Sequence, residues 1–304
     1  MSGFAQRLEG QRVGLSVAAD KAGLESRGFT VAGMNRFTVR LARALLADGA
    51  RLAFGHDWRP EGVMEAIASI AFDYGSTPAT GEQPDILNLL PWPNERSETD
   101  PDLLRRLEGI VEVRPAGLPE DLPPVPGKLE HGTPEWQYRR ARGLTHLRRE
   151  LTLVSSARIA FGGKLVSYDG RLPGIVEEVF LALRAEQPVY LAGLLGGAAE
   201  VMGQGLLEGR DPSGLWEDLR LEELYRQHWE PSASGLDDRD LDRCALGAYL
   251  LSHAARQSLL RNGLSERENE RLLQSSLEEE VLDLVMKGLR AVGARRRPGV
   301  EHPT

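Results

Sequence analysis

The first half of the chain alternates between short apolar runs and longer segments with helical periodicity. The apolar runs predict buried strands at 12–17, 50–55, 86–90, 157–161 and 188–192. Apolar residues spaced by three and four positions predict helices at 34–48, 61–72, 135–154 and from Gly174 onward. Strands that alternate with helices are typical of a mostly parallel sheet with helices on its faces, so the sequence predicts an α/β fold.

The second half of the chain shows no strand pattern after Gly205. Ser265 and Glu268 have the spacing of a capping box, in which the two side chains satisfy backbone N–H groups of a first helical turn. An apolar stripe then predicts one helix to residue 292. With a partner helix at 243–260 it could form an antiparallel pair that packs on the sheet or on another subunit. We therefore divide the chain into an α/β domain, residues 1–205, and a helical C-terminal extension, residues 206–304.

Prolines are concentrated between Val113 and Pro134. Each proline removes a backbone N–H donor and fixes its own φ angle, so a dense run of prolines opposes both helix and strand. The sequence predicts a long surface loop at 113–134.

Composition limits the class of protein. The chain has 304 residues, of which 41% are hydrophobic and 27% charged, and this excludes wholesale disorder. A formal charge of −8 gives no general attraction to nucleic acid or anionic lipid. The single cysteine, Cys244, cannot form an internal disulfide, and the sequence has no pattern of a signal peptide or membrane span. We therefore expect a cytoplasmic protein.

A glycine-rich turn between the predicted strand at 157–161 and the next helix is the main candidate for chemistry. Glycines allow a ligand to approach the backbone closely, and the helix N-terminus offers N–H groups suited to a phosphate. Lys164 and Arg171 add positive charge. In an open α/β sheet such turns lie at the carboxyl ends of the strands, where ligands bind. The alternative interpretation is an ordinary strand-to-helix turn, which also needs glycines.

The same stretch resembles a known superfamily. The motifs are Gly162-Gly163-Lys164, Gly170-Arg171-x-Pro173-Gly174-Ile175-Val176-Glu177-Glu178, Pro188-Val189-Tyr190-Leu191-x-Gly193 and Gly196-Gly197-Ala198-Ala199. They are similar to motifs of the SLOG superfamily. These Rossmann-like domains include the Lonely Guy phosphoribohydrolases, the DNA-processing protein A domain and nucleotide-sensing modules of bacterial conflict systems.

The N-terminal half is similar to the branch of the superfamily that is associated with conflict systems. The matching segments are Val13-Gly14-Leu15-Ser16, Gly55-x-Asp57-x-Arg59-Pro60-x-Gly62, Asn88-x-x-x-Trp92-Pro93 and Asn262-Gly263-Leu264-Ser265. The resemblance covers residues 11–205 and, more loosely, the C-terminus. It implies a Rossmann-like fold and a nucleotide-derived ligand.

The enzymes of the superfamily suggest an alternative function. They cleave a base–ribose bond with an Arg-Lys pair on the preceding helix and a loop of the form Pro-Gly-Gly-x-Gly-Thr-x-Glu-Glu. The resemblance places Arg148-Arg149 at the pair and Glu177 at the catalytic carboxylate. The loop departs from the pattern, because Ile175 replaces a hydroxyl and Pro173 removes an amide donor. A nucleotide N-glycosidase with Glu177 and Arg148 as catalytic residues is thus the alternative to a binding protein.

Several other residues keep two interpretations. Asp57 fits a ribose contact or an ordinary loop contact. Trp92 fits base stacking or packing. Cys244 fits a core thiol better than a nucleophile, because its surroundings in the sequence are apolar. The scattered histidines give no metal site.

A basic segment gives a third function class. Arg139, Arg140 and Arg142 could contact DNA, as in the DNA-processing relatives. Helical arginines with acidic neighbours are more often a solvated face, and the net charge of −8 also opposes DNA binding.

Together these patterns predict a protein that binds a nucleotide-derived small molecule, such as ADP-ribose or another nucleotide signal, in stress or antiviral defence. The expected ligand-binding residues are Ser16, Asp57, Arg59, Gly162, Gly163, Lys164, Arg171, Gly174 and Glu177. The sequence contains no recognisable effector domain, so we expect a readout through homo-oligomerisation or an effector protein in trans. We expect no metal, no cofactor and no membrane or nucleic-acid partner.

Overall fold

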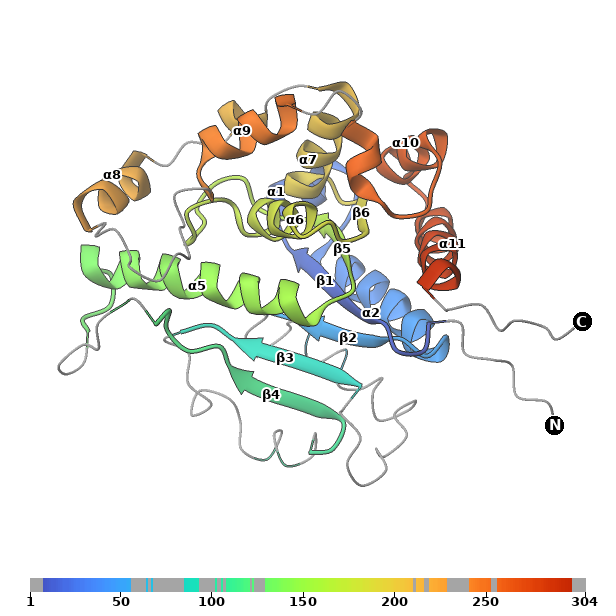
Figure 1. Ribbon diagram of the computed structural model, residues 1–304, viewed down its shortest axis with the longest axis horizontal. Helices are drawn as coiled ribbons and strands as arrows, with labels where there is room; N and C mark the ends of the chain where they lie inside the picture. Colours follow the sequence, from blue (N-terminus) through green and yellow to red (C-terminus); the bar gives the residue numbers. More distant parts are fainter. Residues whose placement is uncertain are drawn as a thin grey trace, which may run out of the picture.

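The computed structural model describes residues 8–55, 85–92, 108–120, 129–209, 212–215, 219–228, 241–252 and 256–296, with isolated positions at 64, 67, 102, 105 and 122. Its parallel six-stranded sheet has the order β4-β3-β2-β1-β5-β6 (Figure 1). The strands are β1 (Arg12–Ala18), β2 (Arg51–Phe54), β3 (Ile86–Leu90), β4 (Val111–Pro115), β5 (Ala157–Gly162) and β6 (Val189–Ala192). The predicted α/β fold is confirmed.

Some of the described helices lie between strands along the chain, and the others come after the last strand, β6 (Figure 1). They are α1 (Lys21–Ser26), α2 (Val31–Ala47), α5 (Pro134–Val154), α6 (Gly174–Arg184), α7 (Gly197–Glu208), α8 (Leu219–His228), α9 (Arg243–Ser252), α10 (Glu266–Gln274) and α11 (Glu278–Arg296), with short 3-10 helices η2 (Pro212–Leu215) and η4 (Arg256–Leu260). Two of the long helices, α2 and α5, begin with a side-chain N-cap. Thr30 accepts from Gly33 at α2, and Thr133 accepts from Trp136 at α5.

Two layers of helices cover the sheet. On one face, α2, α10 and α11 enclose a core that includes Val13, Leu15 and Val17 of β1. Phe37 of α2 meets Phe161 of β5 edge to face there, with ring centroids 5.4 Å apart. On the other face, α6, α7 and α9 form a second core with β5 and β6, and α5 forms a third with β2 and β3.

The strand order places a crossover point at the centre of the sheet. The chain builds outward from β1 in one direction through β2, β3 and β4, and then returns to the other side of β1 with β5. Strands β1 and β5 pair from Val13 with Ala157 to Ala18 with Gly162, so their carboxyl ends lie together. In open α/β sheets this topological switch point is where ligands bind.

Strand β4 corrects the sequence analysis, which predicts a loop from residue 113. Val111–Pro115 forms the edge strand beside β3, and Pro115 is its last residue. The N–H of Ala116 donates to the carbonyl of Leu90 at 2.9 Å, so the ladder continues past the proline. Proline is tolerated at the end of an edge strand because its missing N–H faces no neighbour.

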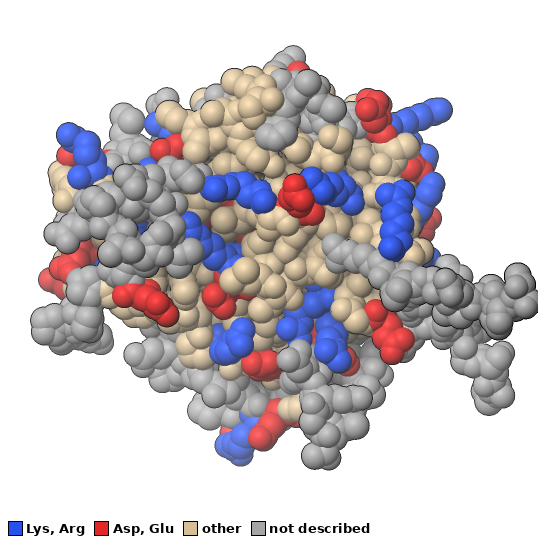
Figure 2. All heavy atoms as spheres, viewed as in Figure 1, with Lys and Arg blue, Asp and Glu red and all other residues tan. Residues whose placement is uncertain are grey.

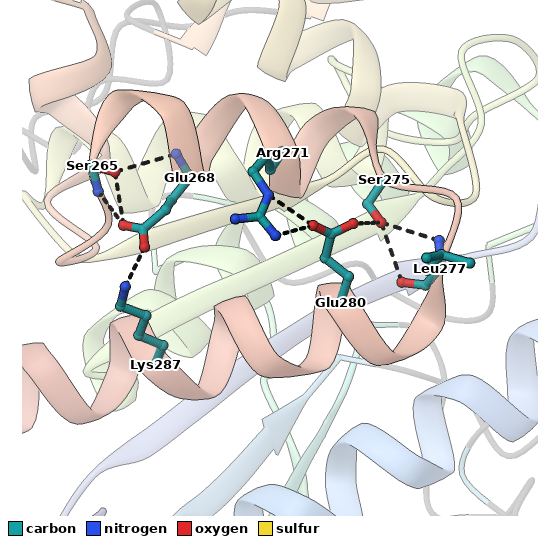
Figure 3. Close-up of polar contacts among 7 residues, drawn as sticks. All are labelled: Ser265, Glu268, Arg271, Ser275, Leu277, Glu280 and Lys287. Atoms are coloured by element: carbon teal, nitrogen blue, oxygen red, sulfur yellow. Dashed lines mark hydrogen bonds and ion pairs between the residues drawn. The ribbon is translucent and has the colours of Figure 1, made fainter.

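The C-terminal helices also differ from their prediction. The capping box at Ser265 and Glu268 is confirmed, but the predicted single helix is two helices, α10 and α11. Ser275 takes an extended conformation, and its hydroxyl accepts from the N–H of Leu277 and contacts Glu280 at 2.7 Å (Figure 3). Serine favours such local hydrogen bonds, which compete with helix continuation.

The expected pairing of residues 243–260 with the last helix is wrong. Helix α9 ends at Ser252, and its Leu246 and Leu250 pack in the core that contains Phe180 of α6. Helices α10 and α11 pack in the core on the other face of the sheet, beside α2 (Figure 1). The predicted helix at 61–72 lies outside the described residues, apart from two isolated positions. Helix α7 runs to Glu208, across the proposed boundary at residue 205, and the division into two domains stays a prediction.

We expect Gly193→Ala to destabilise the fold by about 3 kcal/mol, the upper range for an overpacked core. A Cβ atom at Gly193, just after β6, would lie 1.9 Å from the backbone carbonyl oxygen of Leu273, so α10 would have to move. The control is Gly214→Ala in η2, where a Cβ atom meets nothing within 4 Å. Urea unfolding of both variants measures the difference, and equal midpoints would contradict this packing.

We expect the stability that Glu268 contributes to depend on pH. Hydrogen bonds from Lys287 and Ser265 lower the pKa of Glu268 from 4.5 to about 2 (Figure 3). Because the folded pKa is depressed, this contribution is complete above pH 4.5 and is lost as the pH falls toward 2. Glu268→Ala should therefore lower the free energy of unfolding by about 1 kcal/mol at pH 7, and by progressively less as the pH falls from 4.5 to 2. Glu270→Ala, on the same helix, is the control, and a pH-independent gap between wild type and Glu268→Ala would overturn the expectation.

Candidate functional site

The candidate site lies where β1 and β5 end. The N–H of Gly163 donates to the carbonyl of Ala18 at 2.8 Å, and the N–H of Ala198 in α7 donates to the carbonyl of Gly163 at 3.0 Å. The loop between β5 and α6, residues 163–173, is therefore fixed at its start to both β1 and α7, and we call it the switch-point loop. The amide of Gly163, which the sequence analysis assigns to a ligand, binds the chain itself in this structure.

The glycines of this loop are explained by the chain's own close packing. Gly162 and Gly163 have φ angles of +68° and +101°. A Cβ atom at Gly163 would lie 2.8 Å from Ile175, and one at Gly162 would lie 2.7 Å from the carbonyl oxygen of Ala18. A Cβ atom at Gly170 or Gly174 would lie 2.6 Å or 2.8 Å from the Arg148 guanidinium. At these four positions the close approach is to protein atoms.

A buried network of charged side chains lies directly beneath the loop. Arg148 of α5 donates from Nη1 to Oε2 of Glu177 at 2.8 Å, and Arg158 of β5 donates from Nη1 to Oε2 of Glu178 at 3.3 Å. The hydroxyl of Ser16 in β1 donates to the same oxygen of Glu178. Glu177 and Arg158 are 0% exposed. The network joins two strands and two helices at the switch point.

The strand pattern places this network. Successive residues of a strand point to opposite faces, so Gly14 and Ser16 face α5 and α6 while Val13, Leu15 and Val17 face the other core. A Cβ atom at Gly14 would lie 2.7 Å from the Arg158 guanidinium, so only glycine leaves room for that group. Burial lowers the pKa of Arg158 from its usual value, and the negative charge of Glu178 opposes this shift. Two arginines and two glutamates balance in charge, as a buried network requires.

Arg171 points away from this network. Its Nη2 atom lies 3.6 Å from Oδ2 of Asp242, and its Cζ atom lies 4.7 Å from the centre of the Tyr225 ring. Tyr225 belongs to α8, and Asp242 immediately precedes α9. The structure therefore separates Arg171 from Ser16 and Glu177, with which the sequence analysis groups it.

Lys164 and the N-terminus of α6 are the remaining parts of the expected site. Lys164 is exposed just beyond the Gly163 contact. Pro173 precedes α6, and no side chain caps the N–H groups of the first turn, which begins at Gly174. These N–H groups and Lys164 suit an anion at the carboxyl edge of the sheet. Asp57 and Arg59 lie outside the described residues.

Sequence reasoning missed Arg158 and Glu178 as members of the network. An arginine inside an otherwise apolar strand is itself a signal, because a buried charge needs a partner. It also missed Arg27, which follows α1. Arg27 donates to the carbonyl of Gly193 at 3.2 Å and to Glu200 of α7 at 2.6 Å, so it ties the loop after β1 to α7.

Other candidate residues take structural roles. Cys244 is an exposed free thiol, so the expectation of a core thiol is wrong; Leu246, two residues on, takes the buried face of α9. Trp92 packs against α5, where a Cβ atom at Gly143 would lie 3.2 Å from its side chain. No group of residues suited to a metal ion occurs in the described part of the chain.

The basic segment considered for DNA binding is largely inside the protein, so the solvated face that the sequence analysis favours for it is wrong. Arg139 and Arg142 are buried, and Arg140 donates to the carbonyl of Trp92 at 2.8 Å. On the face drawn in Figure 2, acidic and basic side chains are interspersed. Among the described helices, none has the length and apolar content needed to cross a membrane.

The strand order and the switch-point loop define a Rossmann-like α/β protein. The chain belongs to the SLOG family, because the family model SLOG cluster2 matches residues 7–272. Membership indicates nucleotide-related binding or processing. The X-ray structure of TM1055, a Northeast Structural Genomics Consortium target, is similar over 69% of this chain and 87% of its own, with 16% identity and a TM-score of 0.38. No curated protein matches the chain.

We expect Arg148→Met to destabilise the protein by about 3 kcal/mol, because it leaves the Glu177 carboxylate buried without its 2.8 Å partner. Adding Glu177→Gln should recover part of the loss by removing the buried charge. Arg149→Met, one position along α5 and only partly buried, should cost well under 1 kcal/mol. Chemical unfolding measures all three, and equal effects at 148 and 149 would contradict the buried pair.

Proposed function

We propose that the protein binds a nucleotide-derived small molecule, of the ADP-ribose or nucleotide-signal kind, as a sensor in stress or antiviral defence. One observation carries the proposal: the uncapped first turn of α6 lies at the β1–β5 switch point of a SLOG fold. Backbone N–H groups of that turn hold the phosphate, and exposed Lys164 neutralises it.

The buried network serves this site from beneath. It holds α6 and the loop before it against α5 and β1, so the phosphate-binding turn is rigid before a ligand arrives. A rigid site loses less conformational entropy on binding. In this proposal Ser16 and Glu177 position the turn, while Lys164 and Gly174 contact the ligand. Occupancy is read out in trans, through oligomerisation or an effector protein.

Hydrolysis of a nucleotide is the second candidate, and the Arg148–Glu177 pair favours it. These are the two residues that the resemblance to the enzymes places at the catalytic positions, and they lie 2.8 Å apart. Glu177 is 0% exposed, however, so the loop above it must open before the carboxylate reaches a ribose. This cost makes binding without turnover our first choice.

The two functions predict different results from one experiment. The protein is heated with ADP-ribose, NAD, AMP or adenosine, and each mixture is then analysed for free base. A sensor is stabilised by a phosphorylated nucleotide and releases no base, because a ligand that binds only the folded state raises its apparent stability. Base release that disappears in Glu177→Gln would establish the hydrolase. Stabilisation by none of the nucleotides would contradict the sensor.

We expect Lys164→Glu to weaken binding of the phosphorylated ligand about tenfold, which corresponds to about 1.4 kcal/mol. The substitution places a negative charge beside the phosphate and leaves buried groups untouched. Arg267→Glu reverses an equally exposed charge on α10 and is the matched control. Titration calorimetry measures both. Similar affinities for the two variants would show that the phosphate lies elsewhere.

A further inference from the structure

Arg171 is one of the residues through which the switch-point loop contacts the predicted C-terminal extension. Its guanidinium lies 3.6 Å from the Asp242 carboxylate and stacks 4.7 Å from the centre of the Tyr225 ring. Tyr225 belongs to α8, and Asp242 immediately precedes α9. We refer to Arg171, Tyr225 and Asp242 as the Arg171 junction.

Each carboxylate oxygen of Asp242 makes a different contact at this junction. Its Oδ1 atom accepts from the N–H of Ala245 at 2.7 Å and so caps α9, while its Oδ2 atom faces Arg171. The start of α9 is therefore tied electrostatically to the loop that precedes α6. The separation of 3.6 Å exceeds that of a hydrogen bond, and Asp242 is 30% exposed, so this ion pair is a weak one.

Tyr225 extends the junction to α8 and α5. It is buried and meets Tyr138 of α5 edge to face, with ring centroids 5.2 Å apart. Tyr138 in turn accepts a hydrogen bond from Arg142 at 2.9 Å. A cation over a tyrosine ring contributes about 0.5–2 kcal/mol, depending on its exposure to water. Arg171 thus holds α8 by a contact comparable in strength to its contact with α9.

The neighbours of Arg171 and Asp242 make the two segments move together. Leu172 and Leu241, each adjacent to one of these residues, are fully buried in the same apolar core, together with Leu246 of α9. A shift of the loop at Arg171 therefore disturbs the packing under α9 as well as the ion pair. Closely packed cores transmit such strain.

Arg171 is also close in sequence to the proposed anion site. It stands three positions before Gly174, the first residue of α6. For a phosphate at the first turn of α6 to bind Arg171, the guanidinium must leave Asp242, and a bidentate arginine–phosphate contact is stronger than a single ion pair at 3.6 Å. The Arg171 guanidinium cannot make its best contact with the ligand's phosphate and with Asp242 at the same time.

We propose that Arg171 couples the ligand site to the C-terminal extension by exchanging Asp242 for the ligand's phosphate. When the site is empty, Arg171 holds α8 and α9 against the loop. When a nucleotide binds, Arg171 turns to the phosphate, and α8 and the start of α9 are released for a partner or a second copy. This inference rests on the proposed function and supplies its missing readout.

Thermodynamic linkage gives the expected effects. If ligand binding weakens the Arg171–Asp242 contact, then a substitution at Asp242 that weakens this contact must strengthen ligand binding by the same factor. Asp242→Asn keeps an oxygen that caps α9 and removes the charge, so we expect ADP-ribose or AMP to bind about fivefold more tightly. Arg171→Gln removes the exchanged group, so we expect about tenfold weaker binding.

The matched control breaks a different ion pair, which joins the chain just after α6 to the extension. Arg261 donates to Glu186 at 2.7 Å, far along α6 from its first turn. Glu186→Gln should leave nucleotide affinity unchanged. Calorimetric titration of wild type, Asp242→Asn, Arg171→Gln and Glu186→Gln measures the pattern. Affinity that does not rise in Asp242→Asn would overturn the exchange.

Hydrogen exchange separates failure of this inference from failure of the proposed function. Arg171→Gln should speed amide exchange in α8 and at the start of α9 without any ligand, and Glu186→Gln should not. In wild type, ADP-ribose or AMP should cause the same increase. If no nucleotide binds wild type but Arg171→Gln still speeds exchange there, the junction stands and the nucleotide proposal fails. If Arg171→Gln leaves exchange in α8 and α9 unchanged, the coupling fails whatever the ligand does.

Discussion

The burial of two arginine–glutamate pairs beneath the switch point governs the arrangement of the molecule around it. Removing a charge from water is costly unless an opposite charge and hydrogen bonds replace the lost solvent. Arg148 and Arg158 meet that condition only when α5, α6, β1 and β5 hold their observed positions. The volume of the two guanidinium groups then requires glycine at 14, 170 and 174, where a Cβ atom would lie within 2.8 Å of them. One electrostatic constraint thus explains three glycines on two separate segments of the chain, β1 and the stretch that runs from the loop into α6.

The network also decides which residues remain available to a ligand. Ser16 and Glu177 satisfy buried partners, and Gly163 satisfies Ala18, so these groups support the site from within. At the carboxyl edge Lys164 is exposed, and Gly174, the first residue of α6, is half-buried. A phosphate fits this division, because it needs N–H donors and a cation at the surface and a rigid backbone below. Bond cleavage by Glu177 would require the support itself to open.

The sequence predicts the sheet and most of its helices, because periodicity reports which residues are buried and strands β1, β3, β5 and β6 are strongly apolar. Prediction from the sequence fails where the secondary structure depends on the place of a segment in the fold and not on its own apolar pattern. Pro115 is compatible with a strand only because β4 lies at the edge of the sheet, and the apolar stripe of the last helix hides the break at Ser275. The Gly-rich loop and the SLOG family are found correctly. The partners of its residues are not, since Arg148 and Asp242 come from distant segments that periodicity cannot relate to the loop.

The switch-point loop is held by two arginines of unequal strength, and the difference determines which contact yields. Arg148 donates a hydrogen bond to Glu177 at 2.8 Å, and the Glu177 carboxylate is 0% exposed. Arg171 reaches Asp242 at 3.6 Å, and that carboxylate is 30% exposed. Breaking the first pair removes the 2.8 Å partner of a buried carboxylate, whereas breaking the second exposes a carboxylate that water can solvate and that still caps α9. We therefore expect the contact with Asp242 to yield before the contact with Glu177 when the loop moves. A chain with this asymmetry can change the position of α8 and α9 while the loop stays fixed to α5 and the sheet.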